Sequence, residues 1–206
     1  MPKYSQELNQ SIDPTTRKTC KSCGLYLNQL PIFDKSKKSS VFWVGLSAVQ
    51  FAEDEEKIPL SPFTRSGGLI AKIEEPFNDK ISFYKTNLVK CVPLNKDKIR
   101  YPVKLEMENC FPNFQSEIEL LNPKLIFLLG KQVASFVSNK LGAEEVDLND
   151  QFKFESFTRN GIVFVPIHHP SYILVYKRKS IDDYSRGIHS FLRTMHGKRK
   201  TTMVFA

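Results

Sequence analysis

The feature that most constrains this chain is a set of four cysteines, the only ones among its 206 residues. Cys20 and Cys23 form a C-x2-C hook, whereas Cys91 and Cys110 lie far along the chain. Thiolates at such spacing suit either a zinc ion or an iron–sulfur cluster, which would join distant segments at one centre. Two disulfides, or four unrelated thiols, are the alternative.

The first 13 residues are polar and do not resemble a secretory signal peptide, so we expect a cytoplasmic protein with reduced thiols. No apolar run approaches the roughly 18 residues of a membrane helix, so we expect no membrane partner. The net charge of +8 and the pI near 9.3 favour a polyanionic partner such as DNA. A merely soluble basic protein would share this composition.

The length and the 41% hydrophobic content predict one globular domain, which we expect to be a monomer. We place this domain at residues 20–196, between a polar N-terminal segment, 1–19, and a basic C-terminal tail, 197–206.

Short apolar runs alternate with segments of helical periodicity. The apolar runs predict buried strands at residues 41–45, 83–89, 125–130 and 162–167. Helices are predicted from Ser66 towards Pro76 and over 103–121, 132–140 and 182–195, with a kink or break at Pro112. Asn160-Gly161 is typical of a hairpin turn.

This alternation predicts an α/β fold, a three-layer α/β/α sandwich around a mainly parallel four-stranded sheet. Ligands bind such sheets beyond the carboxyl ends of the strands. The unusual residues of this sequence lie in three segments at the ends of predicted strands, so we expect them to converge on one edge; they are residues 45–49, 87–91 and 168–172.

Several motifs, taken in order, resemble those of the uracil-DNA glycosylase superfamily, closest to its iron–sulfur-containing, family 4-like branch. Residues 44–48 (VGLSA) stand where that branch has G-E-A-P-G, and 62–70 (PFTRSGGLI) resemble P-F-V-G-x-A-G-x-L-L with one residue fewer. Residues 86–91 (TNLVKC), 123–130 (PKLIFLLG) and 169–171 (HPS) match T-N-x-V-K-C, P-x-x-I-x-x-L-G and H-P-[SA]. The four cysteines match the cluster ligands of that branch in order. The resemblance as a whole runs from about Cys20 to Phe191.

The resemblance implies a monofunctional DNA glycosylase, a hydrolase that flips a base out of DNA and leaves an abasic site. It implies a [4Fe–4S] cluster on Cys20, Cys23, Cys91 and Cys110, with zinc as the alternative. We expect the cluster to be structural, because hydrolysis of a glycosidic bond transfers no electron.

The resemblance also implies roles for residues of the site. Phe63 resembles the ring that stacks on the flipped base, and Asn87 the amide that reads its edge. His169 resembles the residue that stabilises the anion developing on the leaving base. We expect contacts with the DNA backbone from a further set: Arg65, Lys90, Ser171, Tyr172, Lys177 and Arg178.

The chain departs from the family pattern at the first motif. Ser47 stands where some branches hold the attacking water with a carboxylate or asparagine; a serine orients water but is no base at neutral pH. Leu46 replaces the family's glutamate, and Val49 lies near the position where some members reject the methyl group of thymine. These changes leave room at the base edge.

The leading hypothesis is therefore excision of uracil or a modified pyrimidine from DNA. A first rival is the same chemistry on a hypermodified cytosine of phage DNA, in host defence. A second is a catalytically inactive iron–sulfur module that binds DNA, and a third is a zinc-stabilised protein that binds RNA or DNA.

Overall fold

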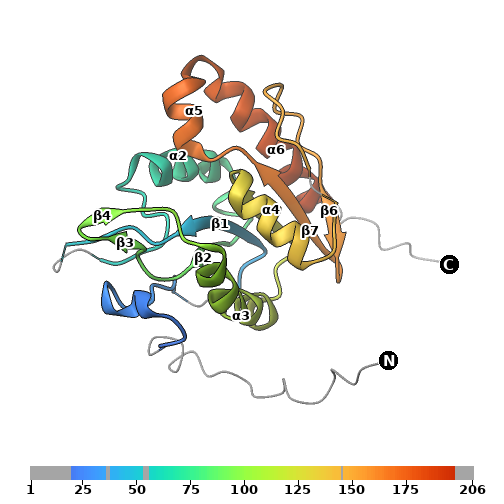
Figure 1. The fold of residues 1–206 in the computed structure, drawn as a ribbon. Coiled ribbons are helices and arrows are strands. Elements are labelled where there is room, and N and C mark those ends of the chain that lie inside the picture. The colour runs from blue at the N-terminus through green and yellow to red at the C-terminus, as the bar shows by residue number, and fades with distance from the viewer. Residues whose placement is uncertain (1–19, 36–37, 53–55, 145, 198–206) are drawn as a thin grey trace, which may run out of the picture.

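The protein is an α/β sandwich whose central sheet has five strands (Figure 1). The computed structural model describes residues 20–197 except 36–37, 53–55 and 145, so the two predicted terminal segments lie almost wholly outside the described residues. The strand order is β2-β1-β5-β7-β6. The strands are β1 (Val41–Ser47), β2 (Phe83–Val89), β5 (Leu125–Leu129), β6 (Phe157–Arg159) and β7 (Ile162–Ile167).

Four of these strands are parallel, and they are the four that the apolar runs predict. The predicted number of strands was one too few, because β6 adds an antiparallel edge strand to β7. The Asn160-Gly161 turn joins β6 to β7, and both of its residues have positive φ, 50° and 76°. Two consecutive positive φ angles are the geometry of the tight hairpin turns that asparagine and glycine favour.

Helices cover both faces of the sheet, as predicted. One face carries α2 (Arg65–Glu74), α5 (Pro170–Tyr176) and α6 (Ile181–Gly197); the other carries α3 (Lys104–Leu121) and α4 (Lys131–Lys140). Three 3-10 turns complete the helical segments: η1 (Gly24–Leu27), η2 (Glu75–Phe77) and η3 (Arg178–Ser180). A small hairpin of β3 (Leu94–Asn95) and β4 (Lys98–Ile99) stands apart from the sheet.

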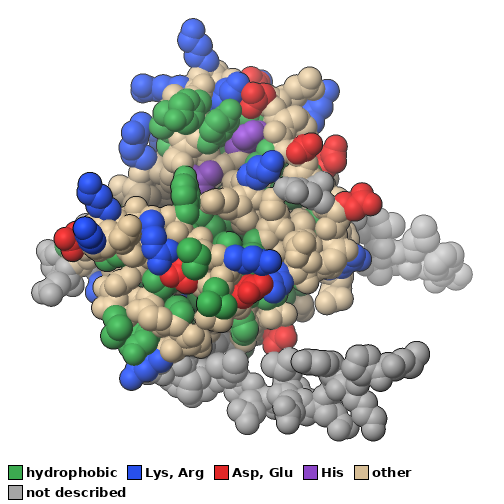
Figure 2. Space-filling model, viewed as in Figure 1, with side chains coloured by type: hydrophobic (Ala, Val, Ile, Leu, Met, Phe, Trp, Pro, Cys, Tyr) green, Lys and Arg blue, Asp and Glu red, His purple; other side chains and the backbone are tan. Residues whose placement is uncertain are grey.

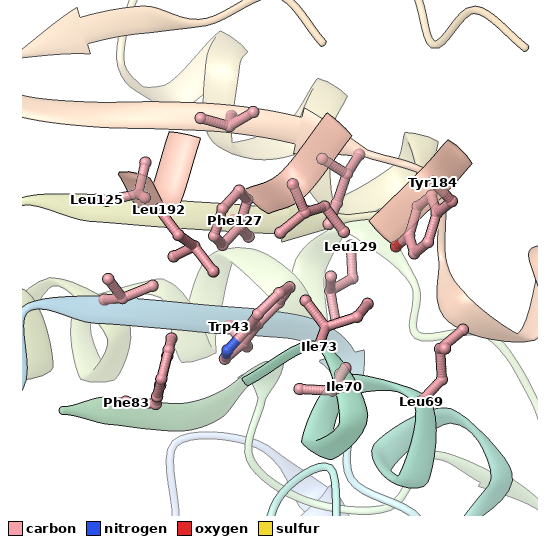
Figure 3. Close-up of a cluster of buried hydrophobic side chains, with 14 of the residues drawn as sticks. Trp43, Leu69, Ile70, Ile73, Phe83, Leu125, Phe127, Leu129, Tyr184 and Leu192 are labelled. Atoms are coloured by element: carbon pink, nitrogen blue, oxygen red, sulfur yellow. The ribbon is translucent and has the colours of Figure 1, made fainter. Parts of the chain in front are cut away.

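Each face of the sheet has its own apolar core. Trp43 of β1 stacks on Phe127 of β5 with 4.6 Å between ring centroids, and the two rings face Ile70 and Ile73 of α2 and Leu192 of α6 (Figure 3). On the opposite face the alternate residues of the same strands pack on α3 and α4. The strands are therefore buried on both sides, which explains why their sequences are continuously apolar.

Local signals set the helix boundaries. Helix α2 begins one residue before the predicted Ser66, because the Thr64 hydroxyl accepts a hydrogen bond from the Gly67 N–H at 3.1 Å and caps the helix. Helix α3 continues through Pro112 without the predicted break. It ends where Asn122 adopts a left-handed conformation, with φ of 46°, directly before Pro123.

The parallel strands all point in one direction, so their carboxyl ends form a single edge. Among the described residues, none of the helices is long and apolar enough to cross a membrane.

Candidate active site at the carboxyl edge of the sheet

A cavity of about 990 Å³ opens at the carboxyl edge of the sheet. All four parallel strands deliver residues to it: Ser47 from β1, Asn87 from β2, Leu129 from β5, and His169 just beyond β7. The predicted convergence of the strand ends is therefore confirmed.

Asn87 is a buried polar side chain of this cavity, with 4% of its surface exposed. It lies opposite Gly45 in the parallel pairing of β1 and β2. A Cβ atom at position 45 would lie 2.4 Å from the Asn87 Oδ1 atom and 3.1 Å from the Leu60 side chain. Because Gly45 has no side chain, the Asn87 amide and the Leu60 side chain can occupy this space at the cavity wall.

His169 lines the same cavity and caps the N-terminus of α5. Its Nδ1 atom accepts a hydrogen bond from the Ser171 N–H at 3.1 Å and lies 2.7 Å from the Ser171 hydroxyl. Burial lowers the pKa of His169 below its usual value, so the neutral imidazole is favoured at neutral pH. With Nδ1 accepting, the proton of the neutral ring is on Nε2, which is then a hydrogen-bond donor.

The remaining residues of the first motif also reach the cavity. Leu46, Ser47 and Val49 all line it, as the sequence predicts. Val49 is exposed at the surface, whereas Leu46 and Ser47 are half-buried. The wall of the cavity next to β1 is therefore apolar, with one hydroxyl group.

Phe63 does not lie where its predicted stacking role requires. Its side chain is 95% exposed and is not among the residues lining the cavity. It directly precedes Thr64, which caps α2. The rings that do line the cavity are those of Phe51, Tyr101, Tyr172 and Tyr176.

The residues predicted to contact DNA divide into groups. Ser171 and Tyr172 line the cavity, and Arg65 and Arg178 are exposed. Lys177 is half-buried, and its Nζ atom lies 2.7 Å from the Asp150 carboxylate. On the face drawn in Figure 2, Lys and Arg side chains surround the histidines, and apolar side chains lie over α5.

Lys90 contradicts the prediction that it contacts DNA. Its side chain is fully buried, and its Nζ atom lies 2.6 Å from the Glu117 carboxylate and 2.6 Å from the Thr86 hydroxyl. A third hydrogen bond, of 2.7 Å, runs from Nζ to the backbone carbonyl of Asn87. The ammonium group is satisfied inside the protein and supports the strand that carries Asn87.

His168, to which the sequence analysis gave no role, belongs to a network beside the cavity. Its ring stacks on Tyr172 at 5.3 Å, and its Nε2 atom lies 3.6 Å from the Asp150 carboxylate. Since Asp150 also pairs with Lys177, the network ties both ends of α5 to the loop that precedes β6. Asp150 lies in an irregular loop, so no periodicity in the sequence could have indicated this partner.

Three parts of the cavity wall were not predicted from the sequence. Leu60 adopts a left-handed conformation, with φ of 50°, which no motif signals. Lys131 and Gln132 begin α4 directly after β5, so the rule that ligands bind at strand ends could have found them. The third part is residues 99–101, which run from the end of β4 to the residues that follow the β3–β4 hairpin.

The four cysteines gather on one side of the molecule. Cys91 and Cys110 are buried in a small cluster, with Cys23 packed against it. The Asn113 amide lies 3.8 Å from the sulfur of Cys20 and 3.7 Å from that of Cys110. All four thiols are free of disulfide bonds, which removes the disulfide alternative for this structure. Burial raises the pKa of the Cys91 thiol to about 12, and the other three cysteines add to the rise.

Within the described part of the chain, no three His, Cys, Asp or Glu side chains are arranged to hold one metal ion. A four-iron cluster is wider than a single ion, so its thiol ligands surround a cube and stand further apart. The four thiols are soft donors that lie near one another, and either a [4Fe–4S] cluster or a zinc ion accepts such ligands.

The uracil DNA glycosylase superfamily matches the chain over residues 28–193, so the chain belongs to this superfamily. This confirms the resemblance drawn from the motifs and the predicted class, a DNA glycosylase. Three relatives, each named a Type-4 uracil-DNA glycosylase, agree with the branch that the motifs indicate.

The similarity to these relatives is distant but extends over most of the chain. The protein of Archaeoglobus fulgidus is 26% identical over 94% of this chain and 98% of its own length. That of Thermotoga maritima is 26% identical, with 83% of this chain and 86% of its own length covered. That of Sulfurisphaera tokodaii is 27% identical over 79% of this chain, which spans only 66% of that relative.

Proposed function

We propose that the protein hydrolyses the N-glycosidic bond of uracil or a modified pyrimidine in DNA, and that the base is extruded from the duplex into the cavity. The observation that carries the proposal is the presence of Asn87 and His169 in one cavity of a chain from the uracil-DNA glycosylase superfamily. The first can recognise a base, and the second can stabilise its departure.

Asn87 recognises the edge of the base. Its amide oxygen accepts a hydrogen bond from the uracil N3–H, while its NH2 group donates to O4. Burial of the Asn87 amide strengthens the discrimination between bases. A base with the reversed donor and acceptor pattern would leave the buried amide without hydrogen-bond partners. Leu60 beside Asn87 and the other apolar wall residues give the ring an apolar surface.

His169 stabilises the leaving group. As the glycosidic bond breaks, negative charge develops on the base and positive charge on the sugar. The Nε2–H group of a neutral His169, fixed by the Ser171 N–H on the opposite nitrogen, donates a hydrogen bond to the base oxygen on which the charge grows. The donor is oriented before the reaction, so its effect is greatest in the transition state.

Ser47 positions the water that attacks the sugar. It lies at the end of β1 and lines the cavity. A serine hydroxyl does not take the proton of this water at neutral pH, so its contribution is orientation. A mechanism in which the bond to the base breaks before water adds requires no strong base, because the sugar cation is itself a powerful electrophile.

Contacts with the DNA backbone come from the rim of the cavity. Arg65 is exposed between two cavity-lining residues, Thr64 and Ser66, and Arg178 is exposed two residues after Tyr176. Ser171 and Tyr172 line the cavity itself. Lys177 shares its charge with Asp150, so its share of phosphate binding is smaller than that of Arg178. Since no second chain is needed to complete the cavity, we propose that the protein acts as a monomer.

Cys20, Cys23, Cys91 and Cys110 would hold the [4Fe–4S] cluster. When bound, the cluster supplies no chemistry to the hydrolysis and joins the N-terminal hook to β2 and α3. The Lys90 N–H donates a hydrogen bond of 3.3 Å to the Cys110 sulfur, and Lys90 also contacts the strand end at Asn87. The cluster would therefore stabilise the framework that supports the base-reading residue.

The size of the cavity favours a second candidate substrate. At about 990 Å³ it lies at the upper end of the range for ligand pockets, roughly 300–1,000 Å³, and exceeds what one unmodified pyrimidine fills. At the part of the wall that would face the base edge, Leu46 carries no charge and Val49 is small, so neither side chain excludes a substituent on the base. A hypermodified cytosine of phage DNA, excised in host defence, is the substrate that this space would suit.

One experiment separates these functions. The protein is incubated with oligonucleotides that carry uracil, cytosine, thymine or a bulky 5-substituted cytosine, and abasic sites are then cleaved with alkali. Cleavage at uracil supports the leading proposal, and cleavage only at the bulky cytosine supports the second. Binding of DNA without cleavage at any of these bases would support the alternative that the protein is a catalytically inactive DNA-binding module.

A further inference from the structure

Two exposed aromatic side chains line the cavity from different parts of the fold. Tyr176 ends helix α5 and is 73% exposed; Tyr101 follows the β3–β4 hairpin and is 72% exposed. Each has an exposed aliphatic neighbour, Val175 and Ile99, and all four residues line the cavity. Large apolar side chains that crowd the entrance of one cavity, rather than being scattered, mark a binding surface.

The wall that carries Tyr101 is held rigidly. The Arg100 guanidinium donates hydrogen bonds of 2.8 and 2.6 Å to the two carboxylate oxygens of Glu106 in α3. Its Nε atom donates to the Leu94 carbonyl at 3.2 Å, and Glu106 also accepts from the Val103 N–H at 2.8 Å. These bonds join the hairpin to the N-terminus of α3 on both sides of Tyr101.

The charges of the hairpin fit a nucleic acid strand. Lys96 and Lys98 are exposed on its turn and second strand, and Lys131 lines the cavity next to it. An aromatic ring beside lysines is the combination that binds an unstacked base and the phosphates that flank it.

We propose that Tyr101 stacks on a base next to the extruded nucleotide and forms, besides α5, a second wall that holds the opened DNA strand. The inference rests on the proposed function, because it takes DNA to be the ligand of the cavity. A ring on a backbone segment that is already fixed loses less conformational freedom when it stacks than a ring on a mobile segment, so more of its area contributes to binding. Stacking tolerates any base, so Tyr101 would contribute to affinity for all sequences.

The test measures binding and base environment separately from cleavage. The DNA carries an uncleavable abasic-site analogue, with the fluorescent base 2-aminopurine on one side of it. Tyr101→Ala should weaken binding by roughly 5- to 100-fold, the cost of one base–aromatic stack. Tyr101→Phe keeps the ring and should bind as the wild type does. Leu120→Ala, which removes an apolar side chain that is 50% exposed on α3 and does not line the cavity, is the control.

The fluorescence identifies the contact. Stacking on Tyr101 should quench 2-aminopurine in the wild-type and Tyr101→Phe complexes, and the quenching should be lost in Tyr101→Ala at saturating protein. Tyr101→Ala protein that binds as tightly as the wild type, with unchanged quenching, would overturn the inference and leave the proposed function standing. Wild-type protein that binds none of these DNAs would overturn both.

Discussion

Gly45 and Asn87 lie opposite one another on neighbouring parallel strands, and the amide of Asn87 fills the space where a side chain at position 45 would begin. An added Cβ would approach the Asn87 Oδ1 atom to 2.4 Å, which is closer than side chains pack. The base-reading amide therefore depends on the absence of a side chain at its neighbour, although Gly45 itself carries no functional group.

Replacing Gly45 by alanine should accordingly displace the Asn87 amide and slow cleavage by on the order of 10-fold or more, because a small misplacement of a positioning group is costly. The measurement is single-turnover cleavage of the substrate found in the base panel. Gly24→Ala is the control, since an added Cβ there meets nothing within 4 Å. Equal rates for Gly45→Ala and the wild type would show that Asn87 does not read the base from this position.

Removing one partner of the buried Lys90–Glu117 pair should strongly destabilise the fold. Lys90→Met leaves the Glu117 carboxylate buried, with hydroxyl partners only, and should cost about 3–5 kcal/mol in the free energy of unfolding. The double variant Lys90→Met/Glu117→Leu removes both charges and should recover much of this loss. Urea denaturation checks both values; a single variant as stable as the wild type would mean that the pair is not buried.

The iron–sulfur proposal makes a separate prediction. Replacing any one of the four cysteines by serine should bleach the protein and lower its stability, because metal binding and folding are coupled. Ser22→Ala changes the hook without removing a thiol and should keep the colour. Iron and sulfide analysis of protein purified without oxygen gives the direct count, and zinc in place of iron would refute the cluster.

Two histidines, the buried His168 and the half-buried His169, predict a dependence of stability on pH. Burial lowers the pKa of both His168 and His169 below the usual value of 6.5. Below about pH 6.5 the unfolded chain therefore binds more protons than the folded protein, so stability should fall as pH falls through this value. Urea midpoints at about pH 7.5 and about pH 5.5 test this. His168→Phe should reduce the difference, and a midpoint that rises on acidification would contradict the assignment.

Patterns in the sequence predict the core of this fold well and its edges poorly. The runs at 125–129 and 162–167 are apolar throughout because both faces of the sheet are covered, so each strand is evident without its partners. The β3–β4 hairpin and β6 are short and exposed, and such segments carry no hydrophobic period. For this reason the hairpin that precedes Tyr101 was not predicted.

The site shows the same division. The strand-end positions of Asn87 and His169 follow from topology, so their convergence was predictable. The burial of Lys90 depends on Glu117, 27 residues away on another element, and no local feature reveals that pairing. The exposure of Phe63 depends on how Thr64 caps α2, which the motif alone does not indicate.

The most direct test of the account is the rate of base release by the Asn87→Ala and His169→Ala variants, measured in single-turnover reactions at saturating protein on uracil-containing DNA. In the proposed mechanism both residues act on the extruded base, so both variants should bind the DNA nearly as the wild type does. His169→Ala should release uracil on the order of 100-fold more slowly, and Asn87→Ala should also be slowed. Asn139→Ala, an exposed position on α4, should be unaffected. His169→Ala protein that releases the base at the wild-type rate would contradict the mechanism.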